Sequence, residues 1–362
     1  MEWKFSEEQL AYTEALRDWL EDAAPVETVR AWQAVGDSAD FEAQFARDWA
    51  GVGLAEELGG QGGGLVELAQ TAEELARAAA PSAAWMSTVL ATPLLAGRAD
   101  LVEAALAGAT LALLVPSEAI PGSTPPLAMD PAGRITGTVP RVLAGDTAAH
   151  FVVVVQELGA PSLRLVDAGS AGVAVSSRRL LDRSRSVADV VLDGAASEPL
   201  AVEAAAGLEA LAQRAAVLTA ADALGASGRM LELAVEYSKQ RKQFGVAIGS
   251  FQAVKHAAAT IMVAVEAARS VVYFAAASVE SGQPESALHA AAAKAQVTKE
   301  AVKSADSALT MHGAIGYTWE HHLHLFYKRV KLDEQLNGSP TAWNLLLANR
   351  LELIGERTRL LV

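Results

Sequence analysis

The spacing of apolar residues changes twice along this chain, and that change constrains the fold more than any other feature. Up to about residue 108 the apolar positions follow the helical period. From about Leu111 to Leu192 they form short, often Val-rich runs bounded by Pro, Gly and Asp, and from about Glu203 the helical period returns. The sequence therefore predicts a mainly α fold with a middle β domain, divided into an N-terminal helical domain over 1–108, a β domain over 109–200 and a C-terminal helical bundle over 201–362.

The middle segment contains six short runs that are typical of strands, with no helical pattern between them. Such a succession favours a compact antiparallel barrel or sandwich over a parallel sheet, in which helices alternate with strands. No G-x-G-x-x-G follows any of the runs, which disfavours a Rossmann domain. The predicted strands are Leu111–Val115, Arg134–Val139, Phe151–Val155, Leu163–Val166, Val173–Ser177 and Val187–Leu192.

The last third of the chain is Ala-rich and is divided by glycine- and proline-containing turns. Long helices joined by short turns predict an antiparallel bundle. The predicted helices cover residues 203–240, 250–282, 285–311, about 319–336 and 341–356. Near the N-terminus, Ser6 before Glu7 and Glu8 is typical of a helix N-cap.

Charge and cysteine content exclude several classes of function. The formal net charge of −14 argues against nucleic acid or an anionic membrane as the main partner. With 0 cysteines the chain has no disulfide, thiolate metal site or thiol nucleophile. The N-terminus lacks the pattern of a secretory signal, and no apolar stretch resembles a membrane span. We therefore expect a soluble cytoplasmic protein.

A short motif between two of the predicted long helices can bind a nucleotide. Arg241, Phe244 and Gln252 place a cation, an aromatic ring and an amide around a glycine turn. A planar guanidinium suits phosphate charge, because it donates two parallel hydrogen bonds to oxyanions. Downstream, Gly313 lies in the run His312–Tyr317, where glycine permits a close backbone approach to a ligand.

These motifs and the three-part order resemble the acyl-CoA dehydrogenase family over nearly the whole chain. That family holds FAD between its β domain and its helical bundle and oxidises acyl-CoA thioesters to the α,β-enoyl form. A base removes the α-proton and the flavin takes the β-hydride. The segments that carry the resemblance are Glu56–Gly60, Glu73–Leu75, Leu181–Arg183, Tyr237–Gln252, His312–Gly313 and Trp319–His321.

The resemblance implies a set of cofactor contacts and partners. Arg241 would sit on the FAD pyrophosphate, Phe244 near the flavin or adenine, Gln252 on the ADP portion, and the backbone of Gly313 close to the pyrophosphate. In the family these residues reach the flavin of a neighbouring subunit in a dimer of dimers. Electrons would leave to an electron-transferring flavoprotein.

The chain departs from the family at both positions where a glutamate base is usual. Asn337 stands before Gly338–Ser339 at one position, and Ala215 occupies the other. An amide cannot take the proton, so Asn337 is no general base. The β domain also lacks the family's Trp-x-Thr/Ser segment, because Arg141–Leu143 stands in its place.

A further candidate base lies in the apolar part of the helix that carries Ala215. Asp222 lies seven residues further along, two helical turns on and on the same face, alone in an apolar run. Three interpretations are open: a catalytic base whose pKa is raised by burial, a structural hydrogen-bonding group, or an exposed side chain.

His321, His322 and His324 are spaced poorly for three metal ligands, so no metal is expected. Lys328, Arg329 and Lys331 form a basic helix face that could contact CoA phosphates, but a solvated face is the favoured interpretation.

Three functions remain in competition. The first is an FAD-dependent acyl-CoA dehydrogenase that uses Asp222 as its base; small residues on the pocket helix hint at a bulky or steroid-like acyl group. The second is a non-catalytic FAD-binding partner in a heteromeric α2β2 dehydrogenase, where a paralogous subunit supplies the base. The third is an all-helical binding protein without a cofactor.

Overall fold

The computed structural model describes residues 4–54, 56–95, 97–123 and 127–351. The chain packs into two compact units that are each discontinuous in sequence. Unit 1 comprises Met1–Ala31, Ala69–Ala80 and Ala216–Val362, and unit 2 comprises Trp32–Leu68 and Pro81–Ala215. The predicted division into three consecutive domains remains a prediction.

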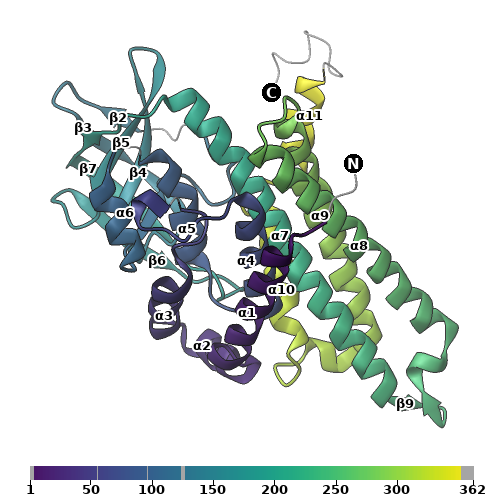
Figure 1. Ribbon diagram of the computed structural model, residues 1–362. Coiled ribbons are helices and arrows are strands. Elements are labelled where there is room, and N and C mark those ends of the chain that lie inside the picture. Colours follow the sequence, from purple (N-terminus) through teal and green to yellow (C-terminus); the bar gives the residue numbers. More distant parts are fainter. Residues whose placement is uncertain (1–3, 55, 96, 124–126, 352–362) are drawn as a thin grey trace. The chain divides into compact units, whose positions relative to one another are not determined.

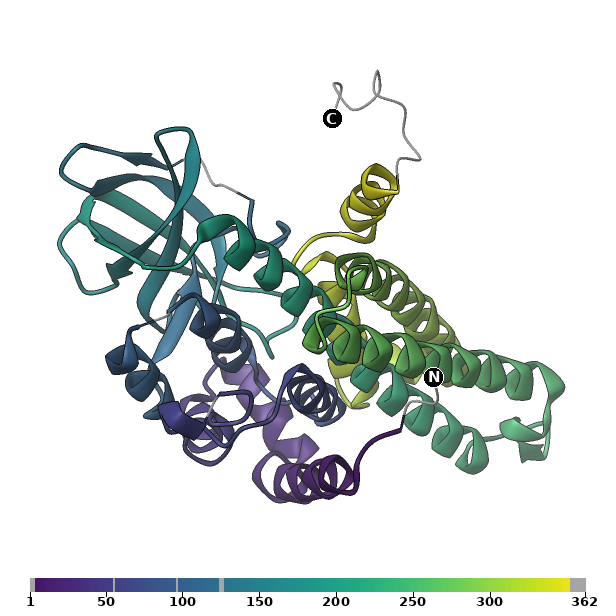
Figure 2. The same ribbon diagram turned by 45° about the horizontal axis from the view of Figure 1, so that its top comes forward.

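Unit 1 is built around long antiparallel helices, as the Ala-rich pattern predicts. Helix α9 packs against α8, α10 and α11, and the long green helices run side by side in both views (Figures 1 and 2). The five predicted C-terminal helices are confirmed within the described residues. They are α7 (Ala204–Gln240), α8 (Gln252–Glu280), α9 (Ser286–His312), α10 (Leu323–Gln335) and α11 (Pro340–Arg350), with η4 (Gly313–Tyr317) between α9 and α10.

The first helix begins where the sequence predicts. The Ser6 hydroxyl accepts a hydrogen bond from Gln9 N, and the Gln9 side chain accepts one from Ser6 N, which together form a capping box. The remaining helices are α1 (Glu7–Ala23), α2 (Val26–Val35), α3 (Ala39–Trp49), η1 (Glu56–Leu58), α4 (Leu65–Arg77), α5 (Ala83–Ala91), η2 (Thr92–Leu94) and α6 (Ala99–Leu106).

Unit 2 contains two four-stranded sheets, and all six predicted strands are present in them. One sheet has the order β1-β4-β5-β8 and the other β2-β3-β7-β6. Buried side chains from both sheets, including Phe151, Val139 and Val190, form one apolar cluster. The strands are β1 (Thr110–Leu113), β2 (Ala128–Met129), β3 (Arg134–Leu143), β4 (Ala148–Glu157), β5 (Ala160–Asp167), β6 (Val173–Arg178), β7 (Val187–Ala196) and β8 (Glu198–Pro199). The sheets therefore form a sandwich with a shared core, not a closed barrel.

One strand pair differs from the antiparallel pattern predicted from the sequence. β1 pairs with β4 in parallel, whereas the other pairs of the two sheets are antiparallel. A parallel pair requires a crossover connection, and here β2 and β3 of the other sheet supply it between Leu113 and Ala148. α5 packs on β1, and Thr88 Oγ1 of α5 accepts a hydrogen bond from Leu111 N at 3.1 Å.

Helix α8 differs from the prediction that no apolar stretch resembles a membrane span. Among the described residues it is the one helix that is long and apolar enough to cross a membrane by length and composition. It is nevertheless anchored in unit 1, because Arg269 Nη1 and Tyr273 Oη both donate to the buried Glu73 carboxylate, at 2.7 and 2.6 Å. Met262 and Val263, nearer the N-terminal end of α8, are exposed. α8 is thus a bundle helix with exposed apolar side chains.

Candidate functional site

The Arg241 motif forms a short β-hairpin at one end of the unit-1 helices. α7 ends at Gln240, and the chain continues through β9 (Lys242–Gln243) and β10 (Val246–Ala247), which pair antiparallel. Ile248 N donates to Arg241 O at 2.8 Å and closes the hairpin. The Arg241 side chain is exposed. The hairpin therefore presents this guanidinium to any molecule that reaches the end of the unit.

The two residues at the tip of the hairpin explain why an aromatic ring stands out into solvent. Phe244 and Gly245 both have positive φ, 53° and 82°, as a two-residue type I′ turn requires. Such a turn costs little at glycine but strains a residue with a Cβ. The Phe244 ring is 92% exposed, and its only ring contact among the described residues is edge-on to Phe251, at 6.2 Å between centroids. A strained, exposed aromatic residue is typical of a binding position.

Gln252 and Gly313 lie at the same end of unit 1. Gln252 is the first residue of α8 and is exposed. Gly313 ends α9 with φ 66°, and no other atom lies within 4 Å of the position a Cβ would take. The Tyr237 ring of α7 stacks on His312 at 4.8 Å between centroids, which brings Gly313 beside the end of α7. All four residues that the sequence assigns to a cofactor therefore gather in one region.

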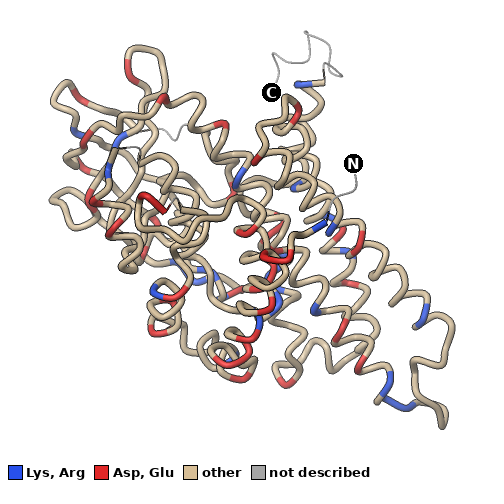
Figure 3. Tube along the Cα trace, in the orientation of Figure 1, with Lys and Arg blue, Asp and Glu red and all other residues tan. Residues whose placement is uncertain are grey.

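This region has the chemistry of a nucleotide diphosphate site. Lys239, Arg241 and Lys242 are all exposed, and Figure 3 shows blue segments at the hairpin end of the bundle. Guanidinium and ammonium groups pair with phosphate, an exposed aromatic ring packs on a planar heterocycle, and an open glycine admits a close backbone contact. FAD, which carries a diphosphate between two ring systems, fits this donor set.

Asp222 forms a buried ion pair with Arg329. Its two oxygens accept from Nε and Nη2 of Arg329 on α10, both at 2.7 Å, and both side chains are 0% exposed. Arg329 Nη1 also donates to Ala80 O at 2.7 Å. A bidentate guanidinium stabilises the ionised carboxylate and engages both of the oxygens that a base would use. This geometry matches the structural alternative for Asp222, and the catalytic alternative stays a prediction.

The interpretation of Lys328, Arg329 and Lys331 as a solvated basic helix face is wrong for Arg329. Its side chain is completely buried. Helical spacing gives the reason: positions 328 and 331 share a face, whereas 329 points about 100° away. The spacing separates Arg329 from the two lysines but does not by itself identify its partner, because α10 also carries the buried acid Asp333.

The loop that carries Asn337 is held from inside unit 1. Asn337 Nδ2 donates to Thr219 Oγ1 at 3.0 Å, and Asn337 is itself buried. Lys294 Nζ donates to the backbone oxygens of Asp333 at 2.9 Å and Gly338 at 2.8 Å. Burial lowers the pKa of Lys294 to about 7. The usual base position of the loop is therefore a rigid, neutral amide that hydrogen-bonds to α7.

The histidines predicted not to bind metal are divided among different contacts. The His321 ring lies edge-on to His312 at 4.5 Å between centroids, and His324 lies edge-on to Trp319 at 4.8 Å. His322 Nε2 is 2.9 Å from Glu27 Oε1. Burial lowers the pKa of His321 and of His324 to about 4. The two rings are thus neutral at pH 7 and contribute packing to this end of unit 1.

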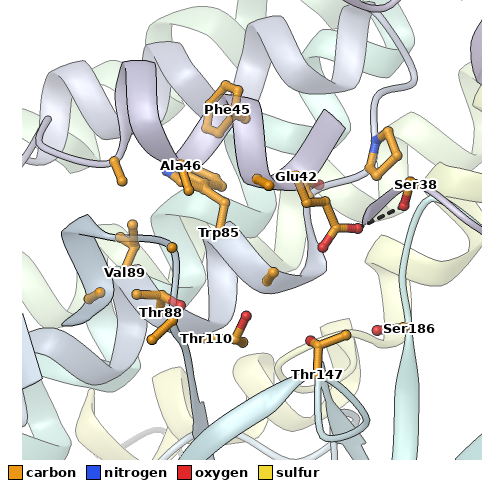
Figure 4. Close-up of a pocket in the computed structure, with 18 of the residues that line it drawn as sticks. Ser38, Glu42, Phe45, Ala46, Trp85, Thr88, Val89, Thr110, Thr147 and Ser186 are labelled. Carbon is orange, nitrogen blue, oxygen red and sulfur yellow. Dashed lines mark hydrogen bonds between the residues drawn. The ribbon is translucent and has the colours of Figure 1, made fainter. Parts of the chain in front are cut away.

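Unit 2 contains a cavity that is not predicted from the sequence. Its volume is about 370 Å³, and its walls come from α3, α5, the start of β1 and the β3–β4 turn (Figure 4). Trp85 and Phe45 supply apolar surface, and the Ser38 hydroxyl donates to Glu42 Oε1 at 2.8 Å. Burial raises the pKa of Glu42, against the effect of the Ser38 hydrogen bond, and the charges of Asp146 and Asp37 raise it further. The cavity is large enough for a small organic ligand.

Comparison with known proteins agrees with this architecture. Residues 6–106 match the family model for the acyl-CoA dehydrogenase N-terminal domain, and residues 207–351 match the model for the C-terminal domain. The acyl-CoA dehydrogenase IpdE2 of Mycolicibacterium smegmatis is 34% identical over 343 residues, which cover 92% of this chain and 96% of that protein. IpdE2 of Mycobacterium tuberculosis is 32% identical over 287 residues, covering 79% of this chain and 78% of that protein.

Solved structures give the same result. The Tcur3481–Tcur3483 steroid ACAD superimposes with a TM-score of 0.86 at 26% identity, over 96% of this chain and 98% of that chain. Butyryl-CoA dehydrogenase from Megasphaera elsdenii superimposes with a TM-score of 0.87 at 22% identity, over 97% and 100% of the two chains. Sequence and fold agree over nearly the full length, and the chain belongs to the acyl-CoA dehydrogenase family.

Proposed function

We propose that this chain is the flavin-binding partner subunit of a heteromeric acyl-CoA dehydrogenase, in which a paralogous subunit supplies the catalytic base. The observation that carries the proposal is the Asp222–Arg329 pair. Asp222, which lies two helical turns beyond Ala215, has no accessible surface, and both of its oxygens accept hydrogen bonds from a guanidinium. The usual base positions hold Asn337 and Ala215. A proton acceptor for the substrate therefore comes from another polypeptide.

The cofactor region supports the same proposal. Arg241, Phe244, Gln252 and Gly313 would hold the ADP half of an FAD. When bound, FAD supplies a hydride acceptor for the oxidation of an acyl-CoA. The chain's own contribution is to bind the diphosphate charge and to cover one ring. Electrons would pass on to an electron-transferring flavoprotein.

The surface of unit 1 also supports a partner subunit. Met262, Val263 and Phe274 expose apolar side chains on α8, at 58%, 70% and 48%. Exposed apolar residues along one helix are typical of a protein interface. The name of the Tcur3481–Tcur3483 steroid ACAD joins two proteins, which is consistent with a heteromer and with a bulky, steroid-like acyl-CoA as substrate. The all-helical alternative is wrong, because unit 2 contains two sheets.

The proposal is tested by removing the Asp222 carboxylate without leaving a buried charge. The double variant Asp222→Leu, Arg329→Met replaces the pair by apolar groups, a change that is often close to neutral for stability. The substrate is an acyl-CoA that bleaches the flavin of the unaltered complex. We expect the complex with the double variant to bleach at a rate within about threefold of the unaltered one. If Asp222 is the base, the rate falls by about 10²–10⁴-fold. The far-ultraviolet spectrum and flavin content, measured alongside, show whether the variant is folded and loaded.

A further inference from the structure

The cavity in unit 2 is lined by a cation that has no acidic partner among the described residues. Arg214, which the unit-2 part of α7 carries, lines this cavity and also a neighbouring one of about 400 Å³. Its Nη1 donates to Val89 O at 3.1 Å. Across the described ranges of the chain, no carboxylate forms an ion pair with it. Burial lowers the pKa of Arg214 to about 10, and no neighbouring charge opposes this effect.

The position of Arg214 gives the cavity two chemically different sides. Val89, whose carbonyl holds Arg214, lies on one side of the Trp85 indole in Figure 4, and Glu42 with its Ser38 hydrogen bond lies on the other. The Glu42 side is acidic, since Asp146 also lines the cavity there and accepts from Ser186. An anion is therefore repelled at one side and attracted at the other.

The surface between these two sides is mostly apolar. Besides Trp85 and Phe45, small and aliphatic side chains form the wall, namely Ala46, Ala84, Val89, Ala105 and Ala109. Such a surface stabilises a hydrocarbon body, because burial removes apolar area from water. A desolvated guanidinium without an acid is costly for the folded protein, and a bound oxyanion would offset that cost.

We propose that the unit-2 cavity binds an apolar molecule with a free carboxylate, which pairs with Arg214 while its hydrocarbon part packs on Trp85. A carboxylate accepts two parallel hydrogen bonds from a guanidinium, which fixes the orientation of the ligand as well as its charge. The inference does not depend on the proposed partner role, because unit 2 contains all of the residues it uses.

Isothermal titration calorimetry with decanoate and with decanol at pH 7 tests this site. The two probes share their hydrocarbon chain and differ in charge. We expect the unaltered protein to bind decanoate at least tenfold more tightly than decanol. Arg214→Met removes this difference, whereas Arg214→Lys retains part of it. Arg134→Met, which removes an exposed guanidinium elsewhere in unit 2, is the matched control and leaves both affinities unchanged.

A second variant keeps the test decisive if Arg214→Met fails to fold. Ala46→Phe adds a ring at the cavity wall and leaves Arg214 in place. We expect it to abolish binding of both probes. Equal affinities of the unaltered protein for decanoate and decanol, no measurable decanoate binding, or decanoate binding that survives Ala46→Phe would each overturn the proposal.

Discussion

Replacing Asp222 by Asn lowers the free energy of unfolding by about 3–5 kcal/mol, because it leaves the Arg329 guanidinium buried without its counter-charge. Both side chains have no accessible surface, so water cannot take the place of the lost carboxylate. The Asn amide also turns a donor NH₂ group toward the Arg329 N–H groups, which need acceptors. Chemical denaturation followed by circular dichroism measures the loss as a shift of the midpoint.

Two further variants identify the cause of that loss. We expect Asp222→Leu combined with Arg329→Met to recover most of the lost free energy of unfolding. A deficit of about 1–3 kcal/mol remains, because the Ala80 carbonyl loses its hydrogen-bond donor. Asp306→Asn is the matched control, since Asp306 pairs with Lys331 on the surface and its removal costs about 1 kcal/mol or less. An Asp222→Asn variant no less stable than Asp306→Asn would show that the buried pair is not a structural contact.

Replacing Arg241 by Leu weakens FAD binding to the complex by about tenfold to a hundredfold. Hydrogen bonds to a charged group are worth about 1.5–3 kcal/mol, which corresponds to that range of dissociation constants. The side chain is exposed at the end of unit 1, so the substitution leaves the fold of the hairpin intact. Flavin fluorescence after serial dilution of the complex gives the dissociation constant.

Lys242→Leu is the matched control for this variant. It removes the same charge from the neighbouring residue of the same hairpin, where the side chain is also exposed. We expect a loss of affinity of threefold or less, because a general electrostatic contribution is screened by salt. Equal losses for the two variants would mean that the hairpin attracts the cofactor by net charge and that Arg241 makes no specific contact.

The sequence predicts the elements of this fold better than it predicts their pairing. The six strands follow from local Val-rich runs, and the cap at Ser6 follows from residues adjacent in the chain. The parallel pairing of β1 with β4 depends instead on a crossover through another sheet. Local patterns contain no information about that connection, so an antiparallel arrangement was the natural expectation.

The candidate site shows the same division. The type I′ turn at Phe244–Gly245 lies within one motif and could be read from it. The partner of Asp222 is 107 residues away, and the role of Arg329 was hidden by the two lysines that share its helix. The acid–cation polarity of the unit-2 cavity depends on Glu42 and Arg214, which are far apart in sequence and share no motif.

The central claim is that this chain contributes part of a flavin site whose base belongs to a different polypeptide. The most direct measurement is the number of FAD molecules per polypeptide in the complex purified through a tag on this chain, together with its subunit composition. We predict one FAD for every two polypeptides and a second polypeptide in equimolar amount. One FAD per polypeptide, in an assembly made of this chain alone, would contradict the account.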